Sequence, residues 1–180
     1  ISPLASTPKR FKTTRGKSLT MHTTLTKRAQ KLQEVLLATG LTPKVLELPG
    51  STRTAVDAAS TIGCEVAQIV KSLIFKTKQS HKPLLVLTSG PNRVNEALVE
   101  SQVGEKIVKA DADFTREVTG FAIGGIPPVG HTQKIDFIFI DEDLLTFESV
   151  WAADGTPNAV FNLGSTDLLA MTGGTVLSIK

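Results

Sequence analysis

The sequence predicts one compact α+β domain, with a mixed and mainly antiparallel sheet surrounded by helices. Its 180 residues are 41% apolar, which suits a single hydrophobic core. Runs of branched apolar residues outnumber segments with helical periodicity, and several runs are joined by hairpin-type turns, which favours antiparallel pairing. No apolar run approaches the length of a membrane span, and no secretory signal pattern is present, so we expect a cytoplasmic protein without membrane contact.

In the first half of the chain, one segment with helical spacing of apolar residues precedes short runs of branched apolar residues. Thr77–Lys82 fits a hairpin connection between two such runs. Either Ser51 or Thr52 can cap the second helix. The elements expected here are, in order, a helix at Leu25–Thr39, a strand at Lys44–Leu48, a helix at Ala55–Ile62, and strands at Ile69–Lys76 and Leu84–Thr88.

Turn and capping residues divide the second half of the chain. Asp111 can cap a helix that ends at Gly120, Asp154-Gly155 is a hairpin turn, and Ser165 can cap the last helix. The elements expected here are, in order, a helix at Asn95–Glu100, a strand at Ile107–Ala110, a helix from Asp111 to Gly120, strands at Lys134–Ile140, Val150–Ala152 and Ala159–Asn162, a helix from Ser165 to Met171, and a strand at Thr175–Ile179.

Positive charge is concentrated at the start of the chain. Residues 1–20 hold five Lys and Arg and no acidic residue, whereas residues 21–180 hold 15 Lys and Arg against 17 Asp and Glu. Nucleic-acid contact by the slightly acidic remainder must therefore come from a local basic patch. Because residues 1–20 have no periodicity and Met21 looks like a natural start, we interpret them as a non-native or accessory leader before a domain at 21–180. A basic arm for nucleic acid is the alternative.

Familiar catalytic signatures are absent. The sequence has no nucleophile elbow, no H-E-x-x-H and no dinucleotide-binding fingerprint. His22, His81 and His131 are isolated from one another, and Cys64 is the single cysteine. We therefore expect no metal, no cofactor and no internal disulfide.

The central stretch Gly120–His131 combines four glycines and two prolines with apolar residues. Gly124 and Gly125 allow a close approach of the backbone to a ligand, or a positive φ. Pro127 and Pro128 stiffen the chain that follows. This composition suits a rigid loop that directs amides at an anion or a carbonyl oxygen, and a tight turn between strands is the alternative.

Lys71 lies in the apolar run at Ile69–Lys76. Strand alternation places it on one face with Ile69, Leu73 and Phe75, which are all apolar. A lysine on a buried face needs an anionic or polar partner, as a substrate-binding lysine does. The alternative is a solvated lysine on the polar face.

Six motifs follow one another in the order and spacing of a known family. They are Val70-Lys-Ser-Leu-Ile-Phe75, Gly90-Pro-Asn-Arg-Val-Asn95, Lys106-Ile-Val-Lys-Ala110, Val118-Thr-Gly-Phe-Ala-Ile-Gly-Gly-Ile-Pro-Pro-Val-Gly-His131, Trp151-Ala-Ala-Asp-Gly-Thr-Pro-Asn158 and Met171-Thr-Gly-Gly174. Through them the sequence resembles the YbaK/prolyl-tRNA-synthetase-associated editing domains, which hydrolyse mischarged aminoacyl-tRNA. The resemblance covers Leu25 to Lys180.

The resemblance implies a sheet partly closed like a barrel and an active site at two of these motifs. In the family, the lysine matched by Lys71 lies near the terminal adenosine of tRNA. Backbone amides of the loop matched by Gly124–Pro128 hold the aminoacyl carbonyl, and the terminal ribose hydroxyl helps to activate water in several members. His131 matches a histidine found in only some branches. Its alternative role is to close the loop through a hydrogen bond.

Substrate-binding residues are expected around these groups. Phe121 and Ile126, together with Ile123 and Val129, can form an apolar wall that limits side-chain size. Arg93 suits phosphate recognition, with a surface position as the alternative, and Trp151 is expected in the core, with base stacking as the alternative. The expected site comprises Lys71, Gly124 and Gly125 as catalytic groups, and Pro128, His131, Arg93, Phe121, Ile126 and Ser72 as substrate-binding residues.

The function expected is metal-independent deacylation of mischarged tRNA in trans, with tRNA(Pro) carrying a small amino acid as the expected substrate. Aromatic residues make up only 5% of the chain, so recognition should be confined to the acceptor end. An aminoacyl-tRNA synthetase is a possible partner. The alternative is a non-catalytic module of the same fold that binds tRNA or a synthetase.

Overall fold

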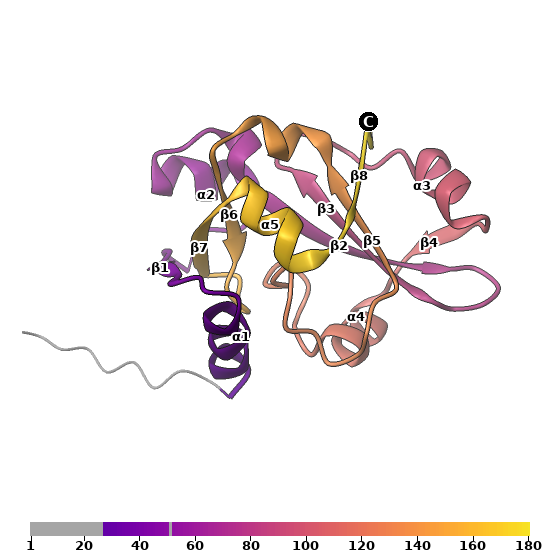
Figure 1. Ribbon diagram of the computed structural model, residues 1–180, viewed down its shortest axis with the longest axis horizontal. Coiled ribbons are helices and arrows are strands. Elements are labelled where there is room, and N and C mark those ends of the chain that lie inside the picture. Colours follow the sequence, from indigo (N-terminus) through magenta and orange to yellow (C-terminus); the bar gives the residue numbers. More distant parts are fainter. Residues whose placement is uncertain (1–26, 51) are drawn as a thin grey trace, which may run out of the picture.

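Two β-sheets form the framework of the structure, a computed structural model that describes residues 27–50 and 52–180 (Figure 1). The strands are β1 Lys44–Glu47, β2 Val70–Thr77, β3 Pro83–Ser89, β4 Ile107–Lys109, β5 Phe137–Asp141, β6 Ser149–Ala153, β7 Ala159–Gly164 and β8 Thr175–Leu177. The α-helices are α1 Lys27–Ala38, α2 Ala55–Ile62, α3 Glu96–Val103, α4 Ala112–Thr119 and α5 Ser165–Thr172. The leader interpreted at residues 1–20, Met21 and the capping candidate Ser51 lie outside the described residues.

Strand pairing agrees with the predicted fold class. One sheet has the order β4-β2-β3-β5-β8 and the other the order β1-β7-β6. Four strand pairs are antiparallel, and the pairs β3–β5 and β5–β8 are parallel. The two sheets are linked by an isolated bridge between Ile69 and Trp151, and the described strands do not form a closed barrel. The α+β fold with a mixed, mainly antiparallel arrangement is thus confirmed.

The predicted turns join the expected strands. β2 and β3 form an antiparallel hairpin, in which the Thr77 amide donates to the Lys82 carbonyl oxygen at 2.9 Å. β6 and β7 form a second hairpin around Asp154-Gly155. Short 3-10 helices at Val66–Gln68 (η1) and Glu142–Thr146 (η2) were not anticipated from the sequence.

Helix caps agree with the sequence at α4 and differ at α2 and α5. The Asp111 side chain accepts from the Phe114 amide at 2.8 Å, as predicted. At α2 the cap is Thr54 instead of Thr52, because Thr54 and Asp57 form a reciprocal capping box. Ser165 is already helical, and its hydroxyl donates to the Phe147 carbonyl oxygen at 2.6 Å instead of capping α5.

Strand alternation divides the core between the two faces of the five-stranded sheet. Leu85 and Leu87 point into the main core, which lies between the sheets and packs against α1 and α5. Leu84 and Val86 point to the opposite face, toward α3. A third cluster packs α2 against Ile69, which precedes β2, and against Val160 of β7. Among the described residues, none of the helices combines the length and the apolar character needed to cross a bilayer.

Candidate active site

A cavity of about 340 Å³ lies beside the Ile69–Trp151 bridge, and both bridge residues line it. Its walls come from the start of β2, from β6 and β7, from the start of α2, and from the central loop. Of the expected site residues, the structure places Lys71, Ser72, Gly124 and Ile126 in the lining.

Lys71 is the second residue of β2 and lines the cavity from there. It shares a face with Leu73 and Phe75, which pack in the core cluster beside α3, so the predicted apolar surroundings are present. Its Nζ donates to the Asn92 carbonyl oxygen at 2.6 Å. Burial lowers the pKa of Lys71, the nearby charge of Arg93 lowers it further, and Asp141 acts in the opposite direction. The polar partner required by this half-buried lysine is therefore the backbone carbonyl of Asn92, and the carboxylate of Asp141 also favours its charged form.

The two adjacent glycines of the central loop have different surroundings. Gly124 has φ +92°, lines the cavity, and has no atom within 4 Å of the position where a Cβ would lie. At Gly125, a Cβ would lie 2.7 Å from the carbonyl carbon of Thr156 in the β6–β7 turn. Gly125 therefore allows the loop to pack on the turn, and only Gly124 faces the cavity.

Free backbone donors of this loop lie at the cavity wall. The Gly125 amide already donates to the Ala122 carbonyl oxygen at 3.1 Å. In contrast, the amides of Ile123, Gly124 and Ile126 have no acceptor among the described residues, and all three residues line the cavity. Their N–H groups are thus available to a carbonyl oxygen or an anion, whereas the Gly125 N–H is already paired.

His131 closes the loop on itself. Its Nε2 lies 2.7 Å from the Pro127 carbonyl oxygen, and because a carbonyl can only accept, Nε2 carries the proton. Burial lowers the pKa of His131, which favours the neutral ring. Neither His131 nor the buried Pro128 contributes to the described cavity lining, so this geometry supports the loop-closing role over substrate contact.

The remaining expected residues take several positions. Phe121 is packed in the main core and is not part of the described lining, whereas Ile123 and Ile126 are. Arg93 is exposed on the turn after β3, outside the lining but close enough to act on the charge of Lys71. Trp151 both packs against the cluster beneath α2 and lines the cavity. Ser72 lines the cavity, yet its buried hydroxyl has no partner among the described residues.

Sequence reasoning missed the wall formed by the start of α2. Thr52 and Arg53 line the cavity from the segment before α2, and Pro157 lines it from the β6–β7 turn. The predicted helix start at Ala55 was the available signal, but the position of this helix depends on contacts with distant segments, such as Ile69 and Val160. In the described part of the chain, no group of three or more His, Cys, Asp or Glu side chains is placed to hold a metal ion.

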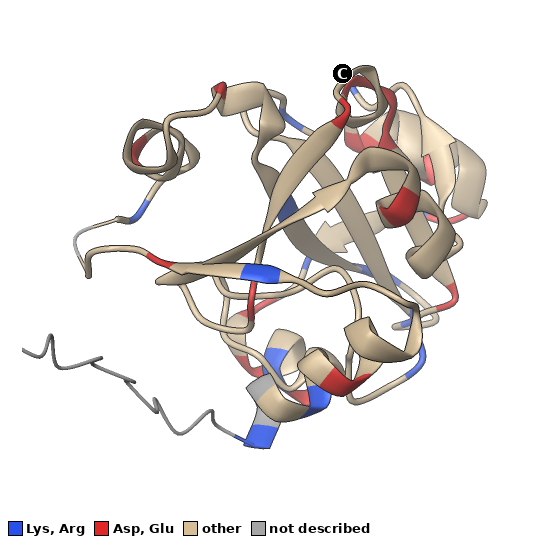
Figure 2. Cartoon of the chain, turned by 60° about the vertical axis from the view of Figure 1, so that its left-hand side comes forward, with Lys and Arg blue, Asp and Glu red and all other residues tan. Residues whose placement is uncertain are grey.

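The cavity brings two cationic side chains, Lys71 and Arg53, to a predominantly apolar wall. Elsewhere, Lys and Arg are distributed over helices, strands and loops together with Asp and Glu (Figure 2). Positive charge near the cavity is therefore local, as the slightly acidic composition of residues 21–180 led us to expect.

Comparison with known proteins places the chain among editing proteins. A crystal structure described as a candidate trans-editing enzyme for prolyl-tRNA synthetase is similar with a TM-score of 0.80 and 45% identity, covering 87% of this chain and 98% of that one. The protein YwhH of Bacillus subtilis (strain 168) is 28% identical over 124 residues, which are 69% of this chain and 78% of YwhH. The proline–tRNA ligase of Limosilactobacillus fermentum is 33% identical over 94 residues, which are 50% of this chain and 16% of the ligase.

The family model described as the aminoacyl-tRNA editing domain matches residues 50–171. That span includes Lys71, the central loop and the start of α2, and so contains most of the cavity wall. The resemblance stated from the sequence is confirmed. This chain belongs to the aminoacyl-tRNA editing domain family.

Proposed function

We propose that this protein is an aminoacyl-tRNA deacylase that acts in trans and hydrolyses the ester of mischarged tRNA(Pro) carrying a small amino acid. The observation that carries the proposal is the free amides of Ile123, Gly124 and Ile126 in a cavity that also holds Lys71. The relation to a proline–tRNA ligase and to a structure described for prolyl-tRNA synthetase supports the choice of tRNA.

Ester hydrolysis requires stabilisation of the oxyanion that forms when water adds to the carbonyl carbon. Preformed amides in a site that excludes water bind this oxyanion more strongly than they bind the carbonyl of the substrate. One such donor typically contributes about 3–4 kcal/mol to the transition state. The loop amides supply these donors without the movement of any side chain.

Lys71 provides a positive charge for the nucleotide part of the substrate. An ammonium acts as a point charge toward a phosphate or a ribose oxygen, and its position beside the amides would align the terminal nucleotide with the ester. The described lining contains no His, Asp or Glu. This favours activation of water by the terminal ribose hydroxyl of the substrate, the route that the resemblance implies.

The apolar wall sets the size of the aminoacyl group. Ile126 and Trp151 line the cavity of about 340 Å³, which is large enough for a small aminoacyl group together with the ribose that carries it. A missing or additional methylene in such a pocket changes discrimination by only about 1–3 kcal/mol, so several small amino acids are candidates.

The test is a comparison of deacylation rates for tRNA(Pro) charged with alanine, serine, cysteine or proline. We expect at least one noncognate ester to be hydrolysed faster than the prolyl ester, and Lys71→Ala to reduce that rate. If the protein binds these tRNAs but none is hydrolysed above the uncatalysed rate, the protein is the non-catalytic binding module and the deacylase proposal is wrong.

A further inference from the structure

We propose that the Ser89–Asn92 turn and Asp141 form a positioning device for Lys71, in which Asn92 is the residue that holds the ammonium group at the cavity. This inference rests on the proposed function, in which Lys71 aligns the terminal nucleotide of the substrate. It assigns roles to Asn92 and Asp141 as positioning residues that act through the lysine.

In the described part of the chain, the lysine has one hydrogen-bond acceptor, a backbone carbonyl. Lys71 Nζ donates to the Asn92 carbonyl oxygen at 2.6 Å, across 21 residues of sequence. A lysine side chain has four flexible bonds, so the position of its ammonium depends on how rigid the acceptor is. The geometry of the turn that carries Asn92 therefore determines where the charge lies.

The turn itself is anchored at both ends. The Asn92 amide donates to the Ser89 carbonyl oxygen at 3.0 Å, and the Ser89 hydroxyl donates to the Ala67 carbonyl oxygen at 2.7 Å. Between them, Gly90 lies so close to η1 that a Cβ would be 2.1 Å from the Val66 carbonyl oxygen. The turn is thus fixed against η1 before the side chain of Asn92 is considered.

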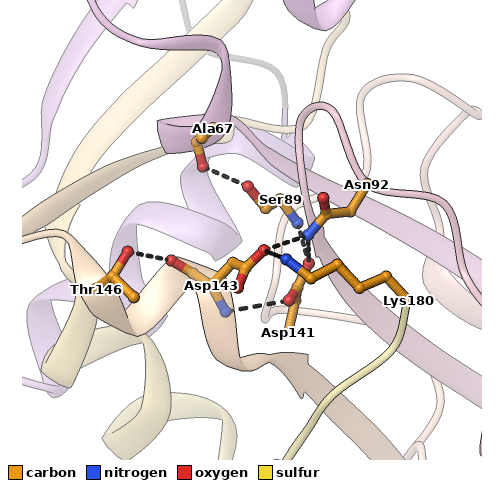
Figure 3. Close-up of polar contacts among 7 residues, drawn as sticks. All are labelled: Ala67, Ser89, Asn92, Asp141, Asp143, Thr146 and Lys180. Carbon is orange, nitrogen blue, oxygen red and sulfur yellow. Dashed lines mark hydrogen bonds and ion pairs between the residues drawn. The ribbon is translucent and has the colours of Figure 1, made fainter.

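Asp141 connects this turn to β5 (Figure 3). The carboxylate is fully buried, and one oxygen accepts from the Ser89 amide at 3.0 Å and from Asn92 Nδ2 at 2.8 Å. Its other oxygen accepts from the Asp143 amide at 3.1 Å. A buried carboxylate with several N–H donors is a strong and directional anchor. Removal of the Asn92 side chain would remove one of the two hydrogen bonds that Asp141 accepts from the turn.

The outer end of the network is exposed. Asn92 Nδ2 also donates to the Asp143 carboxylate at 2.7 Å, and Lys180 pairs with the same carboxylate. Among the described residues, Lys180 bonds to Asp143 and makes no hydrogen bond to Lys71, and its charge also acts on Asp141. It offers a control within the same network.

Nearby charges act on the ammonium form of Lys71 in opposite directions. The charged groups that act on Lys71 are Arg93, which disfavours its ammonium form, and Asp141, which favours it. Arg53 also lines the cavity. Because the Asn92 carbonyl also favours the charged form, loss of that contact should lower the pKa of Lys71.

The experiment compares Asn92→Ala with Lys180→Met and wild type. Thermal unfolding checks the fold, NMR titration of the Lys71 ε-carbon in the free protein reports the ammonium, and single-turnover deacylation reports the reaction. We expect Asn92→Ala to lower the titration midpoint of Lys71 and to reduce the rate at least roughly tenfold, since a small misplacement of a positioning group has a large effect on rate. Lys180→Met should behave as wild type in both measurements.

The outcomes separate this inference from the proposed function. A folded Asn92→Ala protein with an unchanged Lys71 titration or an unchanged rate overturns the inference, as does an equal effect of Lys180→Met. If wild type hydrolyses no mischarged tRNA, the proposed function is wrong, and the NMR titration alone then decides whether Asn92 holds Lys71. Asn92→Ser, which also lacks the amide, replaces Asn92→Ala if the latter does not unfold cooperatively.

Discussion

Alanine substitution at Gly124 and at Gly125 should affect different properties of the protein. At Gly125 the added Cβ meets the backbone of the β6–β7 turn, with Thr156 Cα 2.8 Å and Pro157 N 3.0 Å away. Backbone cannot move aside as the end of a flexible side chain can. At Gly124 the space is open, but φ is +92° and the Cβ would enter the region beside the free amides.

The magnitudes follow from these geometries. Overpacking against backbone costs about 2–3 kcal/mol of unfolding free energy, which is a decrease of about 5–10 °C in melting temperature for a chain of this length. A left-handed conformation costs an alanine about 1 kcal/mol, so Gly124→Ala should unfold only slightly earlier than wild type. Because its amide would be displaced from the oxyanion, its turnover should decrease about 10²-fold.

Gly104 supplies a matched control. It has φ +80° and open space around its Cβ position, as Gly124 does, but it follows α3 and is absent from the described cavity lining. Gly104→Ala should therefore show the same small loss of stability with a normal rate. Urea unfolding and single-turnover deacylation of the three variants give the comparison. If Gly124→Ala turns over as fast as Gly104→Ala, the role assigned to the loop amides is wrong. If Gly125→Ala is as stable as wild type, the packing argument for Gly125 is wrong.

Three further predictions concern charge and metal. Lys71→Ala should lower single-turnover deacylation at least roughly tenfold with a cooperative unfolding transition retained, and a folded variant with the wild-type rate would contradict the role of the lysine. Deacylation should survive EDTA, and loss of activity that zinc restores would reveal a metal requirement. Burial raises the pKa of Asp154 from 3.8 to about 6, so the folded state binds this proton more tightly than the unfolded chain and loses stability as the pH rises through that window. Asp154→Asn should therefore be more stable than wild type by about 1 kcal/mol at pH 8 and no more stable at pH 4, as measured by urea unfolding; an equal difference at both pH values would contradict burial as the cause.

Local patterns in the sequence predicted most of the fold and part of the site. Period-2 alternation placed Lys71 with Leu73 and Phe75, and turn residues located both hairpins, because these features depend on neighbours along the chain. The same patterns could not distinguish Phe121, which enters the core, from Ile126, which lines the cavity as well. Both are apolar residues of one loop.

Contacts between distant segments account for what the sequence did not predict. Gly125 and Thr156 meet only because the central loop packs on the β6–β7 turn, and Asn92 meets Asp141 across 49 residues. The wall formed by Thr52 and Arg53 likewise depends on how α2 packs on Ile69 and on β7. Composition gives the residue types for such contacts but not their pairing.

The Ile69–Trp151 bridge links the two sheets at the cavity. Both bridge residues line it, and the lining includes Leu73 on β2 and Ala153 on β6. The separation of these two walls depends on how the sheets pack on one another. That packing involves core side chains such as Val150 and Phe161, which are not among the lining residues. We therefore expect substitutions at such core positions to change the width of the cavity without any contact to a ligand.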